Sequence, residues 1–182
     1  MGLVVFLTSF AVNAADVLFM QVYQDGKLIQ LEPGGQLYHV AIRYKGQWLH
    51  AHTHNNVDLV DSMEIYGDRF ILMSHPDFAE PTDEYVKYWV GKPFDRTYDW
   101  NNPDANYCTR LIAQVPSLNI PPGKAWFAGK HWSKQTVCVR GREGMGPDDL
   151  FTELFNRGFR PPVADCAVDL EALERPAYSS RR

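Results

Sequence analysis

The sequence predicts an α+β fold in which an antiparallel sheet packs against helices. Three observations support this prediction: alternating strand patterns fill about the first 75 residues, a tight turn joins two of these strands, and helical periodicity begins only after Pro81. The chain has 182 residues, of which 45% are hydrophobic, enough for one globular domain with a substantial core. We therefore expect a single domain over residues 15–182.

The first residues have the character of an export signal. Residues 1–14 carry no charged side chain, and small residues at Ala14 and Ala15 follow an apolar run. A secretory signal combines such a run with a small-residue cleavage site, although no Lys or Arg precedes the run here. We expect a signal peptide over residues 1–14 and a periplasmic or secreted protein; the alternative is a buried first strand. The run is shorter than the roughly 20 residues of a membrane span, so stable membrane insertion is not expected.

Charge and cysteine content narrow the class of protein. The net charge is −4 and no basic run occurs before Arg181-Arg182, which argues against nucleic-acid binding. After export, Cys138 and Cys166 could form a disulfide and leave Cys108 free, whereas three reduced thiols are the alternative. The sequence has no Cys-x-x-Cys pair that would suggest structural zinc.

Strand patterns follow one another in the first half of the chain. Alternating apolar residues between turn signals predict strands over residues 16–23, 27–31, 38–44, 48–54, 57–60 and 69–74. The Gln24-Asp25-Gly26 turn places the first two strands side by side, and Lys45-Gly46 joins the third and fourth as a hairpin.

The Lys45-Gly46 hairpin gathers histidines. His39 lies on the less apolar face of its strand, and His50, His52 and His54 alternate along the returning strand. With a two-residue loop, His39 faces His52 directly and His50 diagonally, at roughly 5 and 7 Å between Cβ atoms. Either residue could orient the His39 imidazole.

Helical patterns occupy the second half of the chain. Acidic residues near the start and Gly91 at the end predict a helix over residues 81–90. Apolar residues at spacings of three and four predict another over residues 108–115, which Pro116 ends. The last patterns are a strand, a helix and an irregular tail, over residues 136–140, 147–155 and 162–182.

Cys108 is the candidate nucleophile because it lies where the second of these helices begins. A thiol at a helix N-terminus is near the positive end of the helix dipole, which lowers its pKa and favours the thiolate. The His39 imidazole would complete the activation if it lies nearby. The alternative is a core cysteine, since cysteine is often buried and a helix face with this spacing usually packs inward.

Four motifs occur in a distinctive order along the chain. They are His39, His50-Ala51 on the returning strand, Gly91-Lys92-Pro93-Phe94-Asp95, and Tyr107-Cys108-Thr109 at a helix start. In order and spacing they resemble the motifs of the circularly permuted NlpC-type, papain-like cysteine hydrolases, the YiiX/YaeF-like group. The resemblance extends from about Gly34 to Val115, and the helix start at residues 147–150 is also similar.

The resemblance implies a permuted papain-like fold and a role for three residues. Cys108 corresponds to the nucleophile, His39 to the general base, and His50 to the third residue, which orients the base. In the permuted group the base precedes the nucleophile, as it does here. His52 is the alternative orienting residue, favoured by the strand register.

The chain departs from the family pattern at two places. Thr109-Arg110 follows the cysteine, where relatives often have Ser-Glu. Phe94 occupies the position that corresponds best to the tyrosine of the oxyanion site, and it has no hydroxyl. Tyr98 is therefore the candidate side-chain donor beside the backbone N–H of Cys108.

The function that the resemblance implies is hydrolysis of amide bonds through a thioester acyl-enzyme. The expected substrate is a small peptide of the cell-wall type, with a lipid or other small acyl compound as the alternative. The chemistry requires no cofactor, and we expect a monomer. The aromatic residues Trp100, Trp126, Phe127 and Trp132 could line a groove or belong to the core.

Two other classes of function stay open. The alternating histidines of the hairpin project to one face near His39, a spacing that could ligate zinc in a metal-binding hydrolase. The other alternative is a non-catalytic binding domain with the same fold, which Phe94 and Arg110 would support.

Overall fold

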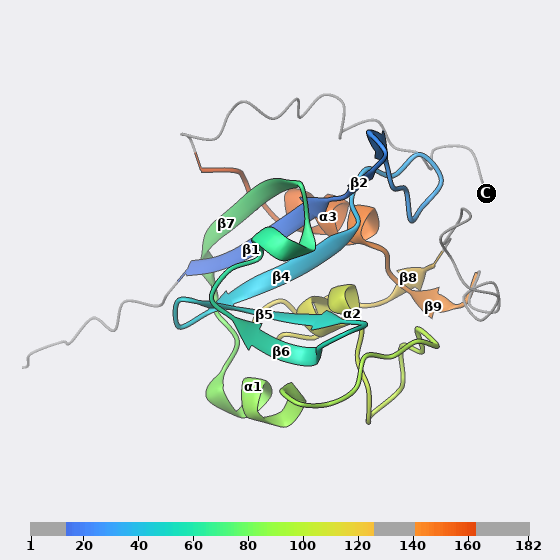
Figure 1. Ribbon diagram of the computed structural model, residues 1–182. Coiled ribbons are helices and arrows are strands. Elements are labelled where there is room, and N and C mark those ends of the chain that lie inside the picture. Colours follow the sequence, from blue (N-terminus) through green and yellow to red (C-terminus); the bar gives the residue numbers. More distant parts are fainter. Residues whose placement is uncertain (1–13, 126–140, 163–182) are drawn as a thin grey trace, which may run out of the picture.

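A computed structural model of the chain describes residues 14–125 and 141–162, arranged as in Figure 1. They form an α+β fold with a five-stranded antiparallel sheet and a few helices. Several predicted features lie outside the described residues: the signal segment before Ala14, the 136–140 strand, most of the tail, Cys138, Cys166, Trp126, Phe127 and Trp132. Within the described part of the chain, no helix has the length and apolar character to cross a membrane.

The sheet has the strand order β6-β5-β4-β1-β7. Its strands are β1 (Ala14–Gln21), β4 (His39–Tyr44), β5 (Gln47–His52), β6 (Asn56–Val60) and β7 (Arg69–Ala79). β4 and β5 form the predicted hairpin, since Tyr44 pairs with Gln47 across a two-residue turn. Both turn residues, Lys45 and Gly46, have positive φ, at 48° and 86°, which matches the right-handed twist of the strands.

The pairing predicted for the first two strands is confirmed only beside the turn, at Tyr23↔Leu28 and Gln24↔Lys27. β1 ends at Gln21 and lies between β4 and β7, with which it pairs on its two sides. The turn after it closes only a small separate hairpin, β2 (Tyr23–Gln24) and β3 (Lys27–Leu28). A turn signal predicts local pairing, whereas the long apolar strand is buried only in the middle of the sheet, where Ala15, Val17 and Phe19 are fully buried.

The sheet has a large core on one face and a small core on the other. Val40 and Ile42 of β4 belong to the large core, together with α2 (Cys108–Ala113) and α3 (Pro147–Asn156). Ala41 belongs to the small core, whose other buried members are Met20, Trp48 and Met63. The predicted alternation of β4 is therefore confirmed, because successive side chains of a strand point to opposite faces.

The three helices start close to where the sequence predicts. α1 (Asp83–Trp89) follows Thr82, which caps it, and ends before Gly91, whose φ is 86°. α3 starts at a proline, which has no N–H to leave unpaired in the first turn. α2 ends two residues earlier than predicted, because the Val115 N–H bonds to the Ile112 carbonyl and tightens the last turn.

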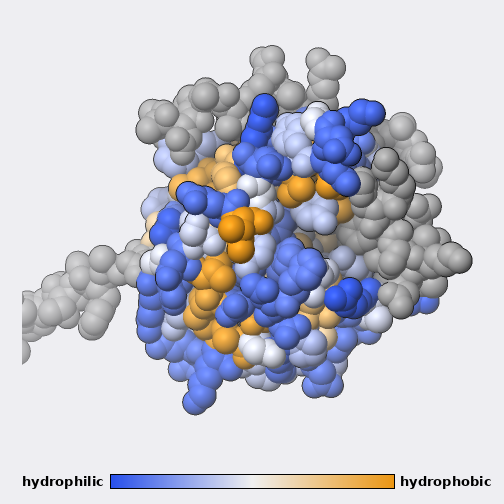
Figure 2. Space-filling model, viewed as in Figure 1, coloured by the Kyte–Doolittle hydropathy of each residue, from blue (hydrophilic) through white to orange (hydrophobic). Residues whose placement is uncertain are grey.

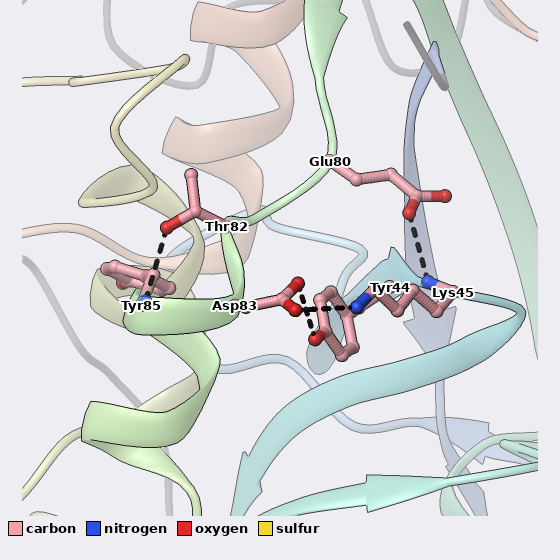
Figure 3. A network of polar contacts seen from close by, with 6 residues as sticks. All are labelled: Tyr44, Lys45, Glu80, Thr82, Asp83 and Tyr85. Atoms are coloured by element: carbon pink, nitrogen blue, oxygen red, sulfur yellow. Dashed lines mark hydrogen bonds and ion pairs between the residues drawn. The ribbon is translucent and has the colours of Figure 1, made fainter. Parts of the chain in front are cut away.

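A polar network ties the β4–β5 turn to the start of α1 (Figure 3). The Asp83 carboxylate accepts the Tyr44 hydroxyl at 2.9 Å and the Lys45 ammonium at 2.7 Å. The Lys45 backbone N–H donates to the Glu80 carboxylate at 2.9 Å, and the Thr82 hydroxyl accepts the Tyr85 N–H at 3.2 Å. Exposed ion pairs contribute little to stability, so the network chiefly holds the hairpin turn in place beside the helix.

Three carboxyl groups meet where the segment before β4 contacts the start of α3. Glu32 is 3% exposed, and its carboxyl accepts the Asp148 N–H at 3.0 Å. The Asp148 carboxylate accepts the Gln36 N–H at 2.8 Å and the Leu37 N–H at 3.2 Å. Burial, and then the charges of Asp149 and Asp148, raise the pKa of Glu32 well above its usual value. Burial therefore favours the protonated form of Glu32, whose carboxyl also shares a hydrogen bond with Asp149.

Replacing Glu32 tests this cluster through the pH dependence of stability. The raised pKa means that the folded state binds more protons than the unfolded state above the usual carboxyl pKa, so stability falls as pH rises through that window. We expect Glu32→Gln, which keeps a donor and an acceptor, to flatten this fall in urea unfolding between pH 5 and 8. Glu32→Ala leaves the Asp148 N–H unpaired and should cost about 1–3 kcal/mol. An equally steep fall in Glu32→Gln would contradict the assignment.

Candidate active site

Cys108 is the first residue of α2, the helix that packs against β4 and β5. Its side chain is 8% exposed and belongs to the large core with Leu111 and Ile112. Three backbone N–H groups are directed at its Sγ: those of Val40, Thr109 and Cys108 itself. The thiol therefore lies against the backbone of β4, directly after His39.

The position of the thiol follows from a separation of two strands. β4 and β5 pair only from Tyr44↔Gln47 to Ile42↔Leu49, whereas β5 stays paired with β6 as far as His52↔Asn56. Alternate residues of a ladder direct their N–H groups to the same neighbour, so the Val40 N–H points toward the opening left by β5. In that opening it meets the sulfur of Cys108.

The pKa of the Cys108 thiol differs from the sequence-based expectation. Burial raises it to about 12, more than the three N–H groups lower it. The expected depression by the helix dipole is therefore wrong for this chain. The physical reason is that α2 has only 6 residues and the sulfur has left water, which disfavours the charged form. The resting side chain is a neutral thiol at neutral pH.

His39 makes its ring contact with His50. Its Nε2 lies 3.0 Å from His50 Nδ1, and both side chains are buried, at 4% and 0% exposure. The His52 ring lies 5.6 Å from the His39 ring by centroids, and its Nδ1 accepts the His54 N–H at 3.4 Å. The strand register favours His52 as the partner of His39, but the β4–β5 ladder ends before His39, and its ring contacts His50 instead.

His39, His50 and His52 are neutral in the fold at neutral pH. Burial, and then the neighbouring His50 and His52, lower the pKa of His39 well below 6.5. Burial and His52 lower the pKa of His50 to about 4, although Asp58 opposes the shift. Burial and His54 lower the pKa of His52. In a neutral imidazole pair one ring nitrogen donates and the other accepts, so the tautomers of His39 and His50 are linked.

Tyr66 covers the histidine cluster from the short helix η1 (Glu64–Tyr66). Its ring centroid lies 4.5 Å from that of His50, 5.0 Å from His52 and 6.2 Å from His39. Its neighbour Ile65 is 84% exposed, so η1 turns the tyrosine inward and the isoleucine outward. The molecular face in Figure 2 is mainly hydrophilic, with scattered hydrophobic patches. Sequence analysis missed Tyr66, because no local pattern connects it to the hairpin.

The described hydrogen bonds join the thiol to backbone N–H groups and His39 to His50, and none of them joins Sγ to the imidazole. Cys108 packs with the face of Val40 and Ile42, whereas His39 starts from the opposite face of β4. The thiol and the His39 imidazole therefore lie on opposite faces of β4, next to the edge where β4 and β5 separate.

Tyr98 lies in the loop between α1 and α2, with a positive φ of 52°. Burial, and then the nearby Cys108 and Tyr38, raise its pKa. Its ring packs against Tyr107 and Phe94, at 5.2 and 5.8 Å between centroids. The tyrosine hydroxyl proposed for the oxyanion site thus belongs to the surroundings of the thiol. Burial and Cys108 also raise the pKa of Tyr38, a second tyrosine near the thiol that the sequence did not predict.

Asp95 organises the loop that carries Tyr98. Its buried carboxylate accepts the Thr97 N–H at 2.8 Å, the Thr97 hydroxyl at 2.6 Å and the Asp99 N–H at 3.0 Å. The Asn102 side chain donates to it at 3.2 Å. One carboxylate therefore closes the loop on both sides of Tyr98, within the Gly-x-Pro-aromatic-Asp motif.

The structure gives no support to the metal alternative in the part of the chain that it describes. Over residues 14–125 and 141–162, no three His, Cys, Asp or Glu side chains are arranged to hold a metal ion. His39, His50 and His52 face one another and Tyr66 through their rings. Trp100, a candidate for a groove, is 7% exposed and packs in the core.

Comparisons of the chain with protein-family models, with curated proteins and with solved structures found no match.

Proposed function

We propose that this protein is a cysteine hydrolase of the amidase or peptidase type, with Cys108 as nucleophile, His39 as general base and His50 as the residue that orients the base. One observation carries the proposal. His39 and His50 form a buried hydrogen bond of 3.0 Å, and the backbone N–H of Val40, the residue after His39, is directed at the Cys108 sulfur. The family resemblance supports the same three residues and a permuted papain-like fold.

The proposed chemistry starts from a neutral thiol and a neutral imidazole. The His39 Nε2–H donates to His50 Nδ1, which leaves His39 Nδ1 free to accept the thiol proton. The proton moves as the sulfur attacks the carbonyl carbon, because burial disfavours a preformed thiolate and imidazolium. Catalytic hydrogen bonds are often long before substrate binds and tighten in the complex.

The attack produces a tetrahedral oxyanion and then a thioester. The imidazolium of His39 returns its proton to the leaving amine, the carbonyl reforms, and Cys108 is acylated. Water then attacks the thioester while His39 takes a proton from it, and the thiol is released. We propose a small peptide of the cell-wall type as substrate, outside the cytoplasm, and a small acyl compound as the alternative.

Replacing Tyr98 with Phe tests the oxyanion assignment. The Cys108 backbone N–H is one donor, and the Tyr98 hydroxyl is the proposed second, in place of the hydroxyl that Phe94 lacks. Loss of one donor typically costs about 10²–10³ in kcat, so we expect a decrease of that order in Tyr98→Phe with little change in KM. Tyr38→Phe is the matched control from the same surroundings. An unchanged kcat in Tyr98→Phe would exclude the hydroxyl as a donor.

A non-catalytic binding domain is the second candidate, because the thiol is 8% exposed and its pKa is raised to about 12. Acylation separates the two candidates. The full chain is treated with p-nitrophenyl acetate, and peptide masses locate the acetyl group. A hydrolase should form and then lose one acetyl group on Cys108, whereas a binding domain should not. Fluorogenic dipeptide amides then test cleavage of the expected bond. Acetylation confined to Cys138 or Cys166 would contradict the proposed function.

A further inference from the structure

The outer nitrogen of His50 has an unusual position. His50 Nδ1 is engaged with His39 at 3.0 Å, whereas His50 Nε2 is buried and has no nitrogen or oxygen partner. The whole side chain is 0% exposed, so bulk water does not reach this atom. A buried donor or acceptor without a partner typically costs about 1–3 kcal/mol, and some other contact must reduce this cost.

Two linked tautomers are possible for the neutral pair. If His50 Nδ1 donates to His39 Nε2, His50 Nε2 carries a lone pair and His39 Nδ1 carries a proton. If His39 Nε2 donates to His50 Nδ1, His50 Nε2 carries a proton and His39 Nδ1 carries a lone pair. Only the second arrangement gives His39 a nitrogen that can accept a proton from the thiol. The surroundings of His50 Nε2 therefore decide whether His39 can act as a base.

Tyr66 is the nearest described ring to His50. The two rings are 4.5 Å apart by centroids, at an interplanar angle of 66°, an edge-to-face arrangement. The face of an aromatic ring is negative and attracts an N–H, but it repels a nitrogen lone pair. An edge of His50 directed at Tyr66 is therefore stabilised when it carries a hydrogen.

The tyrosine is held over the histidines by its own element. Met63, at the start of η1, is 3% exposed in the small core. Gly67, at its end, packs so closely on β1 that an added Cβ would lie 2.8 Å from the Met20 Cβ. The Asn55 side chain donates to the Tyr66 hydroxyl at 2.6 Å. The packing of both ends of η1 and the hydrogen bond from Asn55 thus hold Tyr66 in place.

We propose that Tyr66 is a positioning residue that accepts the His50 Nε2–H on its ring face and so selects the tautomer in which His39 Nδ1 is unprotonated. The role of this tautomer in catalysis rests on the proposed function, whereas the tautomer itself is a property of the fold. Tyr66 acts through His50 and does not touch the reacting atoms.

Nitrogen NMR of the histidine rings tests the inference in the full chain. In the unchanged protein at neutral pH we expect a protonated Nε2 and an unprotonated Nδ1 for His50, assigned with a His50→Asn variant. Tyr66→Phe keeps the ring face and should keep this pattern. Tyr66→Leu removes the ring face and should move both nitrogens toward a mixture of tautomers, with kcat at least 10-fold lower and KM little changed.

The outcomes separate the two proposals. A His50 protonated on Nδ1 in the unchanged protein, or an unaltered His50 pattern in a folded Tyr66→Leu, would overturn the role of Tyr66. If Tyr66→Leu does not fold, the spectra of the unchanged protein and Tyr66→Phe still decide the tautomer. A protein with the expected tautomer that never acylates Cys108 would contradict the proposed function and leave the positioning by Tyr66 supported.

Discussion

Cys108→Ala should lower kcat/KM by about 10⁴-fold or more, because the variant keeps the base and the oxyanion donors but has no atom to form the acyl-enzyme. Cys108→Ser should be almost as inactive, since the weakly acidic hydroxyl needs a stronger base than a buried neutral imidazole. Both variants should fold, because an alanine or serine fits where the sulfur lies. The measurement is initial-rate kinetics with the best acyl substrate found in the acylation screen.

Cys138→Ala provides the matched control for this experiment. It makes the same chemical change at another cysteine and leaves Cys108 in place. We expect full acylation of the protein and unchanged kcat. Hydrolysis that survives in Cys108→Ala, or that is lost equally in Cys138→Ala, would refute the assignment of the nucleophile.

His39→Gln should lower kcat by about 10²–10⁴-fold, the usual contribution of a general base, with a smaller effect on KM. The pH profile gives a sharper readout. Because the pKa of His39 lies well below 6.5, the imidazole is unprotonated at pH 7, and activity should be level from there toward pH 6. As pH falls further, His39 becomes protonated and kcat/KM should decrease. His39→Gln should lose this acid-side decrease.

His54→Gln is the control for the base. His54 is exposed at the end of the same hairpin and belongs to neither proposed catalytic group. It should keep both kcat and the acid-side decrease. If His39→Gln retained the full pH profile, another group would be the base. A decrease near pH 6.5 in the unchanged protein, instead of below it, would contradict the burial of His39.

The hairpin shows how much of this site the local sequence patterns predict. A two-residue turn and strict alternation predict which face His39 occupies, and the structure confirms both. The choice between His50 and His52 needed the tertiary structure. The simple register favoured His52, but β4 and β5 separate after Ile42↔Leu49 and the His39 ring meets His50 instead.

Other features depend on residues far apart in the chain. β1 is an inner strand because β4 and β7 both pair with it, and no turn signal contains that information. Tyr66 reaches the histidines only after the chain has folded over the other face of the sheet. Cys108 begins a helix as predicted, but burial raises the pKa of its thiol, whereas the helix start predicted a lower pKa.

By itself the sequence determined the fold class, the hairpin turn, the starts of the helices and the residue types that could perform thiol chemistry. These depend on backbone preferences and on side-chain periodicity, which act over a few neighbouring residues. Only the tertiary structure decided which histidine contacts His39, that Tyr66 covers the pair, and that the thiol and imidazoles are neutral. Those properties depend on desolvation and on contacts between distant segments, and both exist only once the chain has packed.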